Sequence, residues 1–109
     1  MAFDEGLAQR IHEVLGERKG IEEKRMFGGM AIMLNGNMAV GVIKDEMCVR
    51  CGPDAYEGLL GHPGARVFDF TGRPSKGMLM VNQDVLASDE DLAAWVQHGM
   101  DYAASLPPK

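Results

Sequence analysis

The chain has 109 residues, enough for one hydrophobic core and too few for two, so we expect a single domain over residues 1–109. Hydrophobic residues make up 46% of it and charged residues 25%, which excludes a disordered tail, a collagen-like rod and a disulfide-rich scaffold. The net charge of −5 gives no overall attraction for a phosphate backbone, so binding of nucleic acid by this chain alone is not expected.

An amphipathic helix is predicted over residues 3–18. Apolar side chains recur there at helical spacing, at Phe3, Leu7, Ile11, Val14 and Leu15. Asp4 is the predicted N-cap, and Gly20 follows two basic residues as the predicted stop.

Four short apolar segments come next, and tight turns separate them. Gly28-Gly29, Asn35-Gly36 and Lys44-Asp45-Glu46 are the turn sequences. Because Asn-Gly favours a two-residue hairpin, the segments are predicted to form an antiparallel meander. The four predicted strands are Lys24–Phe27, Met30–Leu34, Met38–Ile43 and Met47–Cys51.

The second half adds a short helix from Pro53, two strands at Arg66–Phe70 and Met78–Asn82, and a last helix capped by Ser88 and stopped by Pro107-Pro108. This order predicts an α+β fold, in which a meander of four strands plus two further strands packs against N- and C-terminal helices. The second and third strands are apolar on both faces. Helices therefore cover both faces of the sheet, or a second copy of the chain covers one and makes a homodimer.

Cys48 and Cys51 form a C-x-x-C sequence. Because Cys48 lies within a predicted strand, the two side chains should point to opposite faces, which favours two buried thiols over a redox or metal pair. The histidines are spaced too widely for a metal site, and no set of catalytic residues is evident, so no metal and no cofactor are expected. No apolar run is long enough to span a membrane, and a soluble cytoplasmic protein is expected.

Candidate contact residues lie in two glycine-containing segments and at Arg50. In Arg25-Met26-Phe27-Gly28-Gly29-Met30 the glycines either permit close backbone packing or form a backbone nest beside Arg25 that holds a carboxylate or a partner. The loop over residues 72–77 lacks the context of a phosphate-binding loop. Its Arg73 and Lys76 are candidates for contact with an anion or a partner.

The Arg25–Met30 string after an amphipathic helix resembles the N-terminal domain of the TfoX/Sxy family of bacterial competence regulators. The similarity extends over residues 3–106 and includes the Asn35-Gly36 hairpin, Phe68-Asp69-Phe70, Gly72-Arg73-Pro74 and the closing Leu92–Trp95 helix. It implies an α+β fold of the kind grouped with type III secretion chaperones, and a regulatory role without catalysis. Regulators of this family act on competence genes together with the cyclic-AMP receptor protein, and they carry a second, C-terminal domain.

The leading hypothesis is therefore a cytoplasmic, non-enzymatic interaction domain that binds another protein. The expected partner is a transcription regulator or a second copy of the chain. The alternative is a small-molecule-binding domain, or an unrecognised enzyme, with a pocket between the sheet and the helices.

Overall fold

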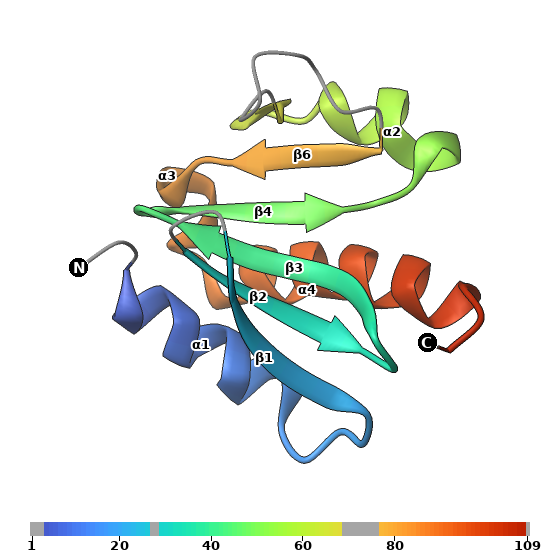
Figure 1. The fold of residues 1–109 in the computed structure, drawn as a ribbon. Coiled ribbons are helices and arrows are strands. Elements are labelled where there is room, and N and C mark those ends of the chain that lie inside the picture. The colour runs from blue at the N-terminus through green and yellow to red at the C-terminus, as the bar shows by residue number, and fades with distance from the viewer. Residues whose placement is uncertain (1–3, 27–28, 69–76, 109) are drawn as a thin grey trace.

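The computed structural model describes residues 4–26, 29–68 and 77–108 (Figure 1). Helices and strands follow the predicted order, and the predicted α+β fold is confirmed. The elements are α1 (Glu5–Leu15), β1 (Ile21–Met26), β2 (Gly29–Leu34), β3 (Asn37–Ile43), β4 (Glu46–Arg50), α2 (Pro53–Leu60), β5 (Ala65–Val67), β6 (Met78–Val81), α3 (Gln83–Leu86) and α4 (Asp89–Ser105).

The strands form one antiparallel sheet in the order β1-β2-β3-β4-β6-β5. The first four strands are the predicted meander. Asn35 and Gly36 join β2 to β3 with φ values of 53° and 86°, the left-handed conformation that an Asn-Gly hairpin turn requires. After α2 the chain returns along the outer edge as β5, and β6 then fills the position between β4 and β5.

The capping residues of α1 decide where this helix begins and ends. The Asp4 side chain accepts a hydrogen bond of 3.1 Å from the Leu7 N–H, as predicted for an N-cap. The predicted end at residue 18 is wrong, because the helix ends at Leu15. Gly16 already has φ 60° and donates its N–H to the His12 carbonyl, and so breaks the helix four residues before Gly20.

Other elements also differ from prediction, most of them by one residue at an end. β1 begins at Ile21, three residues early, because it pairs along the whole length of β2. Gly29 belongs to β2 rather than to a turn. The single-turn helix α3 was not predicted; it forms because the Asn82 side chain accepts a 2.8 Å hydrogen bond from the Asp84 N–H. Phe27, and the end of the predicted strand at residues 69–70, lie outside the described residues.

All four helices pack on one face of the sheet. Each contributes side chains to the main hydrophobic core, among them Ile11, Leu59, Leu86 and Trp95. α4 packs against β3 and β4, and Figure 1 shows it running behind β3. A second, smaller cluster of Cys48, Phe68 and Met80 includes no helical residue among those described. The described helices therefore cover one face, and the expectation that helices cover both is wrong for this part of the chain.

The main core depends on a close approach between α4 and β3. A β-carbon added at Gly99 would overlap the Ala39 carbonyl oxygen and lie 2.6 Å from Val40 Cγ1. The register of β2 and β3 shifts beside this contact, between Ile32 and Met33, so Ala39 is the extra residue of a β-bulge. Glycine is needed at position 99 because helix and strand backbones touch there.

We predict that Gly99→Ala lowers the free energy of unfolding by about 1–3 kcal/mol, because the new methyl group must push α4 away from β3. Gly58→Ala in α2 is the matched control, since a β-carbon there meets nothing within 4 Å; it should raise stability by about 0.5–1 kcal/mol through helix propensity. Urea unfolding followed by circular dichroism measures both changes. Equal effects of the two substitutions would contradict the packing argument.

Candidate functional site

A row of small residues crosses the sheet on the side away from the helices. Ala31, Gly41 and Cys48 are directly opposite one another on β2, β3 and β4, so their side chains point to the same face. The row continues to Met80 on β6. We call this side the second face; its apolar members are Ala31, Met33, Met38, Gly41, Ile43, Cys48, Phe68, Met78 and Met80.

Long, flexible side chains lie along this row. A β-carbon on Gly41 would be 3.3 Å from Met38 Cε, so the Met38 side chain lies over the glycine. Met38, Ile43 and Met78 are partly exposed, whereas Met33 and Met80 are buried. Methionine adapts its shape more readily than branched residues do and is frequent on surfaces that accept varied partners.

Charged residues surround this apolar centre. Arg66 on β5 makes a two-pronged ion pair with Glu46 on β4, with N–O distances of 2.5 and 2.6 Å, and Glu22 and Lys24 are exposed on β1. The registers place all four on the second face. An apolar centre with a charged rim is the usual anatomy of a protein–protein interface.

The predicted contact residues Arg25 and Arg50 do not form one site. Arg25 is exposed on β1 and pairs with Met30, so it belongs to the face that α1 and α4 cover. The guanidinium carbon of Arg50, at the end of β4, lies 5.3 Å from the centre of the Tyr102 ring, a cation–π contact with α4. Three strand spacings, about 14 Å, separate the two residues across the sheet.

Gly29 has a mechanical role. A β-carbon there would overlap the Val42 carbonyl oxygen on the neighbouring strand β3, so glycine lets the two backbones approach. This supports the packing interpretation of that position. Gly28, Arg73 and Lys76 lie outside the described residues, and their predicted contacts remain predictions.

The two cysteines lie on opposite sides of the sheet, as predicted. Cys48 belongs to the second-face cluster and Cys51 to the main core. Burial raises the pKa of Cys48 to about 12 and also raises the pKa of Cys51, whose Sγ lies 3.5 Å from the carbonyl oxygens of Gly52 and Gly77. Both thiols are therefore protonated at neutral pH, which disfavours the thiolate that a nucleophile or metal ligand needs.

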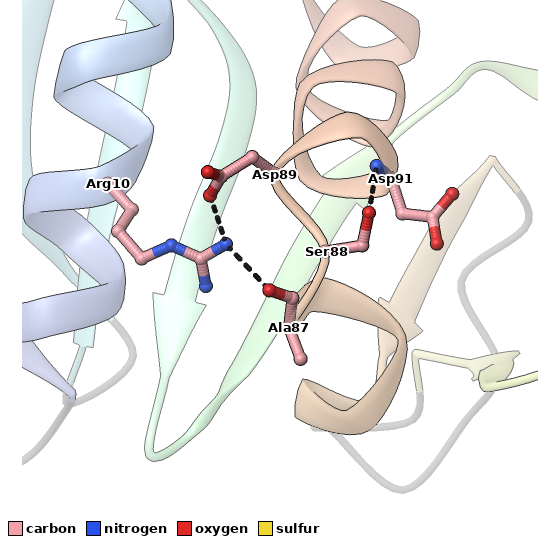
Figure 2. Close-up of polar contacts among 5 residues, drawn as sticks. All are labelled: Arg10, Ala87, Ser88, Asp89 and Asp91. Carbon is pink, nitrogen blue, oxygen red and sulfur yellow. Dashed lines mark hydrogen bonds and ion pairs between the residues drawn. The ribbon is translucent and has the colours of Figure 1, made fainter.

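A cavity of about 340 Å³ lies where α1 meets α3 and the start of α4. Figure 2 shows the Arg10 side chain reaching from α1 to the carboxylate of Asp89, at 2.9 Å, and to the carbonyl oxygen of Ala87, at 3.4 Å. Asp89 has a side chain 97% exposed, against 32% for Arg10, so solvent competes for the carboxylate. The other lining residues are Asp4, Gly6, Leu7, Gln83 and Leu86.

A second cavity, of about 240 Å³, lies between the turn after α2, α3 and α4. Its lining residues are His62, Pro63, Val85, Asp91 and Trp95. The His62 ring meets the indole of Trp95 edge to face, with the ring centres 5.6 Å apart, and the His98 ring also meets it, with the ring centres 5.7 Å apart. These two cavities lie between helices, and a pocket between the sheet and the helices stays a prediction.

Neither cavity gathers metal ligands. Among the described residues no group of three or more His, Cys, Asp or Glu side chains could hold a metal ion. His12 contacts Glu23, at 2.7 Å. In the same part of the chain, no helix combines the length and the apolar character needed to cross a membrane.

Comparison with known proteins gives one result. A family model described as the TfoX N-terminal domain matches residues 13–103, which is most of the chain and includes β1 to β6, α2, α3 and nearly all of α4. The resemblance drawn from the Arg25–Met30 string is thereby confirmed. Neither a search of the curated proteins nor a search of the solved structures found a match.

We predict that Ellman's reagent labels the native chain slowly at pH 8. The pKa of Cys48 is about 12. At pH 8 its thiolate fraction is therefore roughly a thousandfold smaller than that of an unperturbed cysteine. Both thiols should react fast after unfolding in guanidinium chloride. In the Cys48→Ala variant, the rate at which the reagent labels the folded chain measures the reactivity of Cys51 alone. A native rate within tenfold of the unfolded one would contradict the burial of both thiols.

Proposed function

We propose that this chain, which belongs to the TfoX N-terminal domain family, is a regulatory interaction domain that binds a partner protein through the second face and catalyses no reaction. Its resemblance to competence regulators makes a transcription regulator the partner class to test first, and a second copy of the chain the next. The observation that carries the proposal is the one-sided sheet, because every described helix packs on the face opposite to the second face.

The composition of the second face supports binding of a protein rather than solvent exposure alone. A sheet with one face in water normally places polar residues on that face. Here the middle of the second face holds Ala31, Gly41 and Cys48, and the partly exposed Met38 and Ile43 lie beside them. Covering Met38 and Ile43 with a partner would remove further apolar surface from water, which is favourable.

The state of the thiols supports both the absence of catalysis and a cytoplasmic location. Cys48 and Cys51 are unpaired and buried, and burial raises the pKa of each, which argues against nucleophilic chemistry at either sulfur. Unpaired cysteines are typical of reducing compartments.

Met38→Glu tests the proposed surface, with Val14→Glu as the matched control. Met38 is a partly exposed member of the second face, and Val14 is a 40% exposed apolar residue on α1. With a tagged chain expressed in a bacterium, partner proteins quantified by mass spectrometry should fall at least about tenfold for Met38→Glu and remain for Val14→Glu, since only the former buries a charge in the interface.

The outcomes separate the partner classes. Co-purification of an untagged copy of the chain, together with a dimeric mass by light scattering, identifies self-association through this face. If no protein is enriched above the tag alone, or if a folded Met38→Glu chain retains all partners, the second face is not the binding surface.

The alternative of a small-molecule-binding domain is supported by one observation, the cavity at Arg10. Its volume of about 340 Å³ falls within the usual range for small ligands, and Leu7 and Leu86 give it apolar walls. An exposed surface ion pair such as Arg10–Asp89 is worth only about 0–1 kcal/mol, so the carboxylate of a ligand can take the place of Asp89.

This alternative predicts stabilisation by a small organic acid. At a concentration of about 100 times its Kd, a monocarboxylate that binds should add about 2.7 kcal/mol to the free energy of unfolding. It should therefore raise the melting temperature by several degrees, and a panel of monocarboxylates is screened for this shift. Arg10→Gln should abolish the shift, and Arg18→Gln, an exposed residue in the turn after α1, should leave it unchanged. A panel that produces no shift with the unsubstituted chain removes this function.

A further inference from the structure

The cavity at Trp95 has walls of three different chemistries. Pro63 and Val85 are aliphatic, Trp95 and His62 present rings, and Asp91 contributes a carboxylate. Its volume of about 240 Å³ is below the lower end, about 300 Å³, of ordinary small-ligand pockets. The space suits a single long side chain better than a whole metabolite.

Asp91 is a solvent-exposed residue that lines this cavity. The Asp91 N–H donates a hydrogen bond to the hydroxyl oxygen of the N-cap Ser88. Figure 2 shows the Asp91 carboxylate on the side of α4 away from Arg10, which binds Asp89 instead. Among the described residues no hydrogen bond or ion pair to the Asp91 carboxylate is found, and none of the residues that line the cavity is Lys or Arg.

The aromatic wall is held in a fixed position. Trp95 is 5% exposed, so its rim alone reaches the cavity, and the two imidazoles meet the indole at interplanar angles of 78° and 63°. Gly64, with φ 83°, packs so tightly on Val85 that a β-carbon would overlap it. The turn that carries His62 and Pro63 is thereby fixed against α3.

We propose that this cavity binds the guanidinium group of an arginine on a partner protein. A planar guanidinium pairs with a carboxylate through two parallel N–H donors and stacks on an aromatic face such as the exposed imidazole of His62, which an ammonium does less well. The aliphatic stem of the arginine would lie along Pro63 and Val85. The negative net charge of the chain favours a basic partner.

The favourable effect of the α4 dipole on acidic residues explains why this turn contains carboxylates. It does not explain why one of them lines a cavity together with two rings and two aliphatic side chains. The site is also on the helical side of the molecule, so the proposal stands independently of the second face.

N-acetyl-arginine amide is the probe, and Trp95, the sole tryptophan, is the reporter. Titration at constant ionic strength should change the tryptophan fluorescence and shift the single indole N–H resonance until both saturate. The citrulline derivative, which has the same shape without the charge, and the lysine derivative should bind at least about tenfold more weakly.

Asp91→Asn should weaken binding at least about tenfold, because it removes the charge and keeps the shape of the side chain. Asp101→Asn, on the same helix and bonded to Gln97, should bind as the unsubstituted chain does. Asp91→Lys, which places a cation in the cavity, should abolish binding, and circular dichroism checks that each variant is folded. Absence of a saturable change, an equal response to citrulline or lysine, or unaltered binding by folded Asp91→Asn would overturn the proposal, and none of these results would bear on the second face.

Discussion

The contact between the backbones of α4 and β3 is the constraint on which the rest of this structure depends. Gly99 and the bulge at Ala39 bring helix and strand together without intervening side chains, and the apolar residues of α4 then reach both β3 and β4. Because α1 and α3 pack against the same helix and α2 packs on β5 and β6 from the same side, the main core lies on one side of the sheet. Among the described residues no helix covers the other side, and this is the surface that we propose for binding a partner.

This arrangement accounts for the small residues in the middle of the second face. Gly41 must be small because a β-carbon there would lie 2.8 Å from the Met30 carbonyl oxygen of the neighbouring strand. Met38 fills the space above the glycine, so a buried strand is obtained without a covering helix. The same flexible side chain can move aside for a partner, which a β-branched residue with one preferred rotamer does less readily. A glycine at position 41 and a methionine at position 38 therefore suit both the packing of the sheet and the binding of a partner.

The spacing of apolar residues and the turn sequences were sufficient to predict the meander, the caps at Asp4 and Ser88, and the opposite orientations of Cys48 and Cys51. These features depend on neighbours close in the chain. The side of the sheet on which each helix packs depends on contacts between residues that are far apart in the chain. The spacing of apolar residues within one element does not indicate that side. The end of α1 was misplaced because two glycines, Gly16 and Gly20, could each stop the helix, and the nearer one did.

The candidate contact sites were hard to predict for the same reason. Arginines in distinctive strings drew the prediction to Arg25 and Arg50, yet the sheet registers place these residues apart. The first turn of α4 shows what was missed. In sequence, Asp89 and Asp91 are alike, two acids that favour a helix start. In the fold they face opposite directions, and Asp89 ties α4 to α1 through Arg10. Asp91 faces a turn that is 29 residues earlier in the chain at His62, so its role follows from tertiary packing alone.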